Sequence, residues 1–158
     1  ADAGTFFMRV AFRAEGDVAT AGGLAEAFAP VVARFEMRAG LNPVGHRQRV
    51  LLLVSRFGHC LNDLLFRHRI GALNMEIPAI VSNHRDFEAL AASNDIPFVH
   101  LPVTKETKLE QEERLLELVD RERIDLVVLA RYMQVLSPAL CQRLPGRVIN
   151  GSRTVVFR

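Results

Sequence analysis

The chain has 158 residues, enough to bury one complete hydrophobic core and part of a second. Its hydrophobic fraction of 49% and charged fraction of 24% are typical of an ordinary globular protein. Twenty basic residues against eighteen acidic ones give a net charge of +2, and the sequence contains no block of Lys and Arg, which argues against a nucleic-acid partner.

The two cysteines, Cys60 and Cys141, lie far apart and show neither CxxC nor Cys/His ligand spacing. This pattern argues against a disulfide framework or a metal site and fits a reducing compartment. No apolar run approaches the length of a membrane span, and the first residues lack the layout of a signal peptide. The sequence therefore predicts a cytoplasmic protein without a membrane partner.

The first part of the chain predicts one strand and one helix. Residues 5–12 are apolar and aromatic, as in a strand, and residues 24–37 carry apolar side chains at helical spacing. Pro30 lies inside that helical pattern and is expected to kink or split the helix. Because one strand and one helix cannot enclose a core, residues 1–38 are expected to pack on a partner chain or to belong to a larger unit. Residues 39–49 lack periodicity and predict a linker.

From Val50 onwards, predicted strands and helices alternate. The predicted strands are 50–54, 75–82, 98–100, 124–130 and 147–149, and the predicted helices are 58–69, 85–94, 105–123 and 137–144, the last with Pro138 in its first turn. Such alternation predicts an α/β domain, 50–158, with a mostly parallel, open, Rossmann-like sheet.

Two of these helices have a predicted buried side. Leu61, Leu64 and Leu65 lie on one side of the helix 58–69. In the helix 105–123, the apolar stripe is assigned to Leu109, Leu115, Leu116 and Val119, and the solvated face to Lys108, Glu112 and Glu113.

Ligands of open α/β sheets bind beyond the carboxyl ends of the strands, which directs attention to the loops there. The loop 55–61 contains a single glycine, Gly58, and matches neither a dinucleotide-binding loop nor a P-loop. Cys60 follows at the start of a helix, where it is either a thiolate nucleophile or, as we favour, a small buried residue.

The loop after the strand 124–130 is rich in large apolar side chains, where polar turn residues are expected. They are Tyr132, Met133, Val135 and Leu136. Either they pack under the helix that begins near Pro138, or they form a wall for a flat aromatic ligand, with backbone N–H and C=O groups at its edge. Composition alone leaves both interpretations open.

The end of the chain also has two interpretations. Asn150-Gly151 is a strong hairpin signal, with Val148-Ile149 and residues 153–157 as the paired strands. Alternatively, Asn150 ends a strand and opens an active-site loop, and residues are missing between 150 and 151.

Four stretches, in this order and spacing, resemble the formyltetrahydrofolate deformylases of the folate-dependent formyltransferase superfamily. They are 49–84, 96–104, 125–138 and 146–150, with SNH (82–84) and LARYMQVLS (129–137) as the most diagnostic motifs. Residues 1–38 are similar to the second half of the ACT domain that precedes the catalytic domain in that family.

The resemblance implies a formyltransferase fold that hydrolyses 10-formyltetrahydrofolate to tetrahydrofolate and formate for purine synthesis, with no cofactor and no metal. It implies that Met133, Gln134, Val135 and Leu136 bind the folate, and that Asn150 donates a hydrogen bond to the reaction's oxyanion. It also implies a homo-oligomer with a possible amino-acid effector at a partial α+β ACT-like domain.

One part of the family pattern is not matched. The resemblance implies a catalytic His two positions after the Asn, where this chain has Ser152, and an Asp on a later loop, whereas the last Asp is Asp125. Residues 151–158 resemble the family's extreme C-terminus, which favours a seam between 150 and 151.

Three alternatives remain beside the deformylase. The first is a folate-binding or regulatory module without turnover. The second is formyl transfer like that of glycinamide ribonucleotide transformylase, although Arg56, Phe57 and His59 would crowd a phosphate and leave water as the acceptor. The third is a cysteine hydrolase that uses Cys60.

Overall fold

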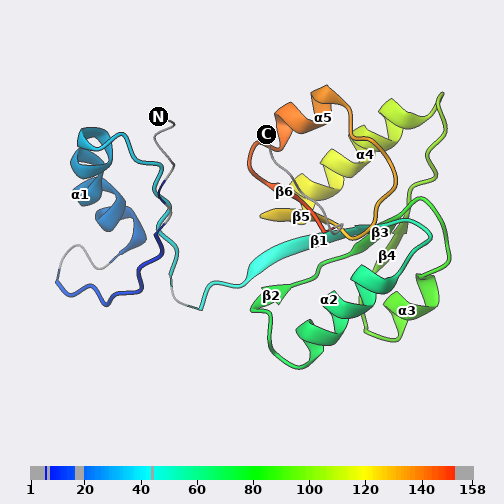
Figure 1. Ribbon diagram of the computed structural model, residues 1–158, viewed down its shortest axis with the longest axis horizontal. Helices are drawn as coiled ribbons and strands as arrows, with labels where there is room; N and C mark the ends of the chain where they lie inside the picture. The colour runs from blue at the N-terminus through cyan, green and yellow to red at the C-terminus, as the bar shows by residue number, and fades with distance from the viewer. Residues whose placement is uncertain (1–5, 7, 17–19, 44, 152–158) are drawn as a thin grey trace. The chain divides into compact units, whose positions relative to one another are not determined.

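The computed structural model describes residues 6, 8–16, 20–43 and 45–151 (Figure 1). The chain divides into two compact units, Ala1–His46 and Arg47–Arg158.

The first unit contains one helix, α1 (Ala21–Arg34). The helix begins after Thr20, whose hydroxyl accepts a hydrogen bond from Gly23 N at 3.1 Å. It continues through Pro30, so the predicted split does not occur. The predicted strand at 5–12 is wrong for its described residues, 6 and 8–12, while Thr5 and Phe7 lie outside them. A strand needs a hydrogen-bonding partner, and the described part of this unit offers no other strand.

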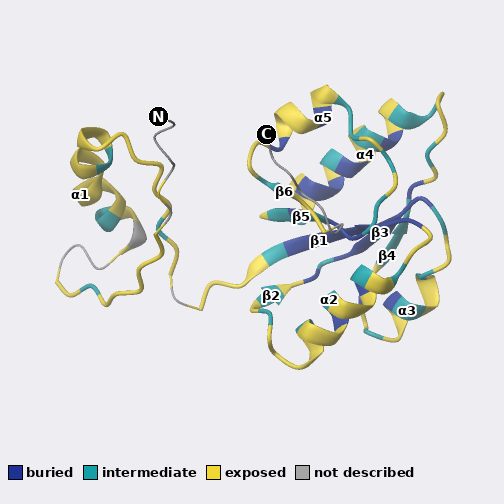
Figure 2. Ribbon diagram, viewed as in Figure 1, coloured by how far each residue is buried: buried dark blue, intermediate teal, exposed yellow. Residues whose placement is uncertain are grey.

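None of the described residues of the first unit is buried, and Figure 2 shows α1 largely exposed. Its exposed large apolar side chains are Phe6, Met8, Val10, Phe12, Phe28, Val31, Phe35 and Met37. As the sequence indicated, this unit does not enclose a core within the described residues.

The second unit is built on a parallel sheet. Its strands are β1 (Gln48–Val54), β2 (Met75–Glu76), β3 (Ile80–Ser82), β4 (Phe98–His100), β5 (Leu126–Leu129) and β6 (Val148–Asn150). The order is β4-β3-β1-β5-β6, all pairs are parallel, and the short β2 pairs with the beginning of β1. The predicted open parallel sheet is confirmed. The single strand predicted at 75–82 is divided into β2 and β3, and Pro78, which has no N–H for a ladder, lies between them.

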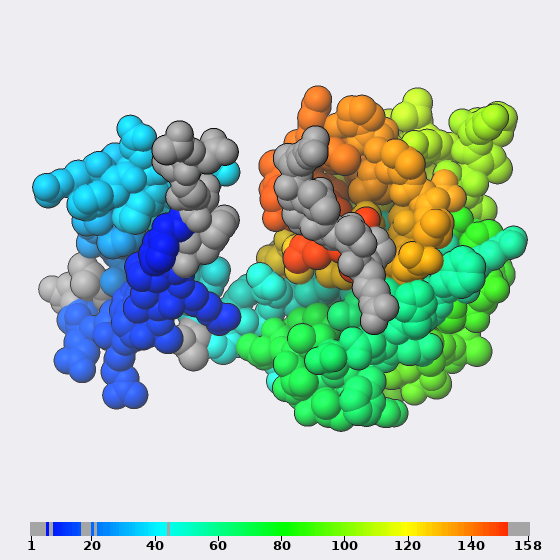
Figure 3. Space-filling model, viewed as in Figure 1, coloured from blue at the N-terminus to red at the C-terminus, as the bar shows by residue number. Residues whose placement is uncertain are grey.

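Helices cover both faces of this sheet. They are α2 (His59–Arg69), α3 (Glu88–Ala92), α4 (Lys108–Arg121) and α5 (Pro138–Arg143). In Figure 1, α2 and α3 lie on one face and α4 and α5 on the other, and the space-filling view in Figure 3 shows the same division into a green and a yellow-to-orange side.

The central strand β1 explains why two layers of helices are needed. Leu51 and Leu53 belong to the core cluster under α4 and α5, whereas Leu52 and Val54 belong to the cluster under α2 and α3. A strand buried on both faces requires apolar residues without interruption, which is the pattern of residues 50–54.

Helix α4 differs from the prediction at Leu109, which is 68% exposed. The buried side of the helix runs through Gln111, Leu115 and Leu118. Since each residue turns the helix by about 100°, Leu109, two residues before Gln111, lies on nearly the opposite side. Glu112 was assigned to the solvated face but is partly buried.

The sheet contains a topological switch point. From β1 the chain adds β3 and β4 on one side, and α4 then carries it to β5 and β6 on the other side of β1. At such a point the loops after neighbouring strands diverge and leave a crevice at the carboxyl ends. Here that place lies between the loops that follow β1 and β5. Within the part of the chain that the structure describes, no helix is long and apolar enough to cross a membrane.

Candidate active site

The ends of β5 and β6 bring Asn150 next to the loop that follows β5. Asn150 pairs with Leu129, and Gly151 N donates to Leu129 O at 2.9 Å, which continues the parallel ladder. A hairpin turn of the Asn-Gly type needs positive φ at both residues, and neither Asn150 nor Gly151 has it. The hairpin hypothesis is therefore wrong at its turn, and its second strand, 153–157, lies outside the described residues. Asn150 stands at the carboxyl end of β6, as the alternative interpretation expected.

Where the loop after β1 leads into α2, the backbone lies close to an aromatic ring. Gly58 is the N-cap of α2, and a Cβ at this position would lie 2.3 and 2.5 Å from two ring atoms of Phe87. Because no other residue lacks a Cβ, only glycine lets α2 start this close to the ring.

The loops after β1 and β5 also contact each other. The guanidinium of Arg131 lies 5.7 Å from the centroid of the Phe57 ring, a cation–π arrangement. Arg131 has a φ of 62°, a backbone conformation that costs energy for any residue with a side chain. Phe57 remains 56% exposed, and His59 is exposed as well. The mouth of the crevice thus carries bulky side chains where the first loop meets the second.

Cys60 joins α2 to the end of β6. Its thiol donates to the carbonyl oxygen of Gly151 at 3.5 Å, and the residue is half-buried against the core cluster of α2 and α3. A nucleophilic thiol needs a base beside it, and this thiol contacts a backbone carbonyl instead. This geometry supports the structural interpretation of Cys60.

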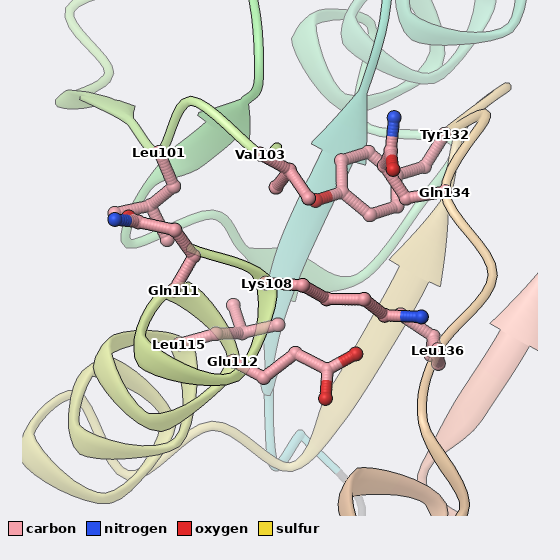
Figure 4. Close-up of a pocket in the computed structure, with 9 residues that line it drawn as sticks. All are labelled: Leu101, Val103, Lys108, Gln111, Glu112, Leu115, Tyr132, Gln134 and Leu136. Atoms are coloured by element: carbon pink, nitrogen blue, oxygen red, sulfur yellow. The ribbon is translucent and has the colours of Figure 1, made fainter. Parts of the chain in front are cut away.

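The loop from Tyr132 to Leu136 alternates between inward and outward residues. Met133 and Val135 are 60% and 82% exposed, whereas Tyr132, Gln134 and Leu136 face α4 (Figure 4). The packing interpretation therefore holds for Tyr132 and Leu136, which pack against the core. Met133 and Val135 are apolar side chains at the surface, and the ligand wall stays a prediction.

A small pocket lies between this loop and α4. It is lined by Leu101, Val103, Lys108, Gln111, Glu112, Leu115, Tyr132, Gln134 and Leu136. Its volume of about 10 Å³ is roughly what one water molecule requires. Gln111 is 6% exposed, and its Oε1 has no hydrogen-bond partner among the described residues, which fits a polar site of that size. The pocket is too small for a pterin ring, so a flat ligand would have to use the outer side of the loop.

Electrostatics at this pocket affect Tyr132. Burial, and secondarily the negative charge of Glu112, raises the pKa of Tyr132 to about 12. The carboxylate of Glu112 also accepts a hydrogen bond from Ser137 N at 2.9 Å. Ser137 in turn caps α5 by accepting from Leu140 N at 3.1 Å. Glu112 thus holds the far end of the loop.

A hydrogen-bonded chain with a buried centre crosses the switch point, and Met133 is the only one of its members to which sequence reasoning assigned a role. Met133 N donates to Ser55 Oγ at 2.9 Å, and Ser55 Oγ donates to Asn83 Oδ1 at 2.7 Å. Asn83 Nδ2 lies 3.3 Å from His84 Nε2. The only signals for it in the sequence were the SNH motif and a polar residue directly after an apolar strand.

Because neighbouring strands are about 4.8 Å apart, His84 after β3 and Asn150 on β6, three strands away, are separated by roughly 14 Å. His84 is therefore not the proton carrier that the resemblance places beside Asn150.

These features define an α/β formyl transferase domain, and the chain belongs to that family: the family model for formyl transferases matches residues 48–151. Among curated relatives, the chain is 44% identical over 148 residues to a formyltetrahydrofolate deformylase from Corynebacterium sp. (strain P-1). This alignment covers 94% of this chain and 52% of that protein. The chain spans about half the length of the curated relatives it matches.

Solved structures agree. A formyltetrahydrofolate deformylase from Burkholderia mallei is 45% identical, with a TM-score of 0.78 over 86% of this chain and 48% of that one. A phosphoribosylglycinamide formyltransferase from Coxiella burnetii is 28% identical, with a TM-score of 0.59 over 66% of this chain and 51% of that one. The predicted formyltransferase fold and the resemblance to the deformylases are confirmed.

Proposed function

We propose that the protein hydrolyses 10-formyltetrahydrofolate to tetrahydrofolate and formate. The observation that carries the proposal is the position of Asn150 at the carboxyl end of β6, beside the apolar loop that follows β5. The similarity to proteins named formyltetrahydrofolate deformylase supports this substrate. The formate would then be available for purine synthesis.

The chemistry needs a donor where Asn150 stands. Water adds to the formyl carbon, and the electron pair of the C=O bond moves to oxygen, which becomes an oxyanion. The oxyanion then re-forms the C=O bond as the C–N10 bond breaks, the electron pair of that bond goes to N10, and N10 takes up the proton that the attacking water gives up. The resulting formic acid ionises to formate. A neutral amide donor stabilises the oxyanion without titrating, and one such donor typically contributes 10²- to 10³-fold in turnover. Asn150 is the catalytic residue that we assign among the described residues.

We assign folate binding to the loop Met133–Leu136. The exposed side chains of Met133 and Val135 are available to one face of a pterin, and the backbone groups of the loop to its polar edge. Gln134 and Leu136 face α4, so in this proposal they contribute through their backbone groups.

Water is the formyl acceptor in this proposal. A second, larger acceptor would have to enter where Phe57, His59 and the Arg131–Phe57 contact lie. The higher identity to the deformylases than to the ribonucleotide formyltransferase also supports hydrolysis over transfer.

The test of Asn150 is formate release by the complete protein. Asn150→Asp places a negative charge where the oxyanion forms, so turnover should fall at least 10²-fold while folate binding persists. Asn62→Asp makes the same chemical change on the exposed surface of α2 and should leave turnover unaltered. Near-normal turnover of Asn150→Asp refutes the assignment. Folate binding without formate release by the unaltered protein selects the module without turnover.

The folate loop is tested separately by binding. Val135→Asp puts a charge on the proposed contact surface and should weaken folate affinity well beyond twofold. Ile70→Asp is the matched control, since Ile70 is also an exposed apolar residue, 59% exposed, but lies at the end of α2. Equal affinities for the two variants contradict the assignment.

We further propose that residues 1–38 are part of an ACT-like domain that associates with a second copy of the chain and that can take an amino-acid effector. The exposed apolar side chains of α1 and of residues 6 and 8–12 support this association. A monomer at micromolar concentration in light scattering contradicts it.

A cytoplasmic location is supported by the free thiols of Cys60 and Cys141.

A further inference from the structure

We propose that Ser55 is the positioning residue of the folate-binding loop: its buried hydroxyl fixes the start of that loop to the sheet across the switch point. The inference rests on the proposed function, since it explains how the loop Met133–Leu136 keeps its place. Ser55 lies at the end of β1, the central strand, and is 2% exposed. A residue so deeply buried does not touch a ligand on the outer side of the loop, and it acts only through its partners.

The directions of the hydrogen bonds make Ser55 the link between two loops. An amide N–H only donates, so Ser55 Oγ accepts at Met133, 2.9 Å away. The hydroxyl of Ser55 therefore donates its own hydrogen bond to Asn83 Oδ1 at 2.7 Å. The Nδ2 atom of the same amide lies next to His84 Nε2. One hydroxyl therefore satisfies a donor from the loop after β5 and an acceptor from the loop after β3, which lie on opposite sides of β1.

The loop is held at both ends and open between them. Met133 N is fixed by Ser55, and Ser137 N is fixed by Glu112 at 2.9 Å. The residues from Gln134 to Leu136 lie between these two anchors, and their backbone groups are the ones assigned to the pterin edge. Since the anchors are side chains directly after β1 and on α4, the loop's placement is set by its packed neighbours rather than by the loop itself.

Loss of the hydroxyl should release one anchor without removing any group that touches substrate. Because the pterin contacts are remote from the formyl carbon, we expect Ser55→Ala to raise the KM for 10-formyltetrahydrofolate about tenfold, the effect of one buried hydrogen bond. The kcat should stay within about threefold, since Asn150 is held by β5 and not by Ser55.

The matched control is Ser82→Ala. Ser82 is also a fully buried serine at the end of a neighbouring strand, and its hydroxyl accepts from His84 N at 3.1 Å. It therefore loses a comparable hydrogen bond, but one that does not reach the loop. We expect the KM of Ser82→Ala to stay within about twofold of that of the unaltered protein, because the lost bond does not contact the loop. A general weakening of the fold would instead raise the KM of both variants alike.

The experiment combines kinetics with hydrogen–deuterium exchange on the complete protein. Ser55→Ala should speed exchange of the Met133 amide at least tenfold, and Ser82→Ala should not. If Ser55→Ala does not fold, Ser55→Cys replaces it, with Ser82→Cys as control, because a sulfur of similar size accepts hydrogen bonds only weakly.

The outcomes separate this inference from the proposed function. Turnover by the unaltered protein with equal KM values for the two serine variants overturns the role of Ser55 alone. Unchanged Met133 exchange in Ser55→Ala overturns it as well. An unaltered protein that neither binds nor hydrolyses the folate overturns the proposed function, and with it Ser55 as a folate-positioning residue, whatever the exchange data show.

Discussion

Tyr132 allows the packing behind the loop Met133–Leu136 to be tested with one spectroscopic signal. It is the single tyrosine of a chain without tryptophan, so tyrosinate absorbance reports this residue alone. Burial against α4 and the nearby carboxylate of Glu112 raise the pKa of Tyr132 to about 12. In the urea-unfolded chain its pKa should return to about 10. We therefore expect the native protein to form tyrosinate about two pH units later than the unfolded chain.

This difference makes stability depend on pH with a definite sign. Below pH 10 both states keep the phenolic proton, and the raised pKa has no effect. Between pH 10 and 12 the unfolded chain releases the proton while the native protein keeps it, so the free energy of unfolding falls as the pH rises. Two units of pKa correspond to about 2.7 kcal/mol over the whole window, which is an upper value for a side chain that is not completely buried.

The measurement is urea unfolding at pH 9 and at pH 11.5 for the unaltered protein and for Tyr132→Phe. Lysine and cysteine side chains titrate in both proteins, so only the difference between them reports Tyr132. We expect the unaltered protein to lose about 2 kcal/mol more than Tyr132→Phe over this interval. Glu112→Gln removes the smaller cause of the shift, so the native pKa of Tyr132 should fall only part of the way towards 10. A native titration midpoint near 10, or equal losses in the two proteins, would falsify the packing described for this loop.

Three further substitutions test other parts of the site and the core. Gly58→Ala should lower the free energy of unfolding by about 1–3 kcal/mol in urea, because the new methyl overlaps the Phe87 ring, and Phe87→Leu in the same chain should recover part of the loss. Leu53→Ala should cost about 2–5 kcal/mol, whereas Leu109→Ala, on the exposed side of α4, should stay within about 0.5 kcal/mol; similar values for the two would contradict the burial assigned to them. Cys60→Ala should leave formate release within about twofold, and abolished release would restore the cysteine-hydrolase alternative.

The sequence predicted the elements whose burial follows a regular pattern, either continuous or periodic. Residues 50–54 are apolar without interruption because β1 is covered on both faces, and Leu61 and Leu65 identify the inner side of α2. Residues 5–12 have the same strand-like composition, but the described ones, 6 and 8–12, have no partner strand among the described residues. Hydrogen-bond partners are not encoded in a single segment.

The sequence predicted the ends of the strands, and with them the place of the candidate site. The roles of its residues stay predictions. Asn150 followed from the order of the strands and the family resemblance, whereas the link from Met133 to Ser55 joins residues 78 positions apart. Such a contact depends on which strands are neighbours. A serine after an apolar strand is too common to indicate it. The burial of Gln111 was also not predicted, since a polar residue on a helix is ordinarily assigned to the solvent-exposed side.

The structure of the loop after β5 explains why its composition fitted two interpretations, packing under a helix and contact with a ligand. Tyr132, Gln134 and Leu136 face α4, and Met133 and Val135 lie between them in the sequence and point outward. The inward residues supply the packing that holds the loop, and the outward ones leave an apolar surface that packing does not require. In the function proposed above, this surface, with Val135 82% exposed, is the side of the loop that receives the pterin. A loop that is anchored on its inner side and apolar on its outer side can receive a flat ring without first being ordered, so less binding energy is lost on forming the site.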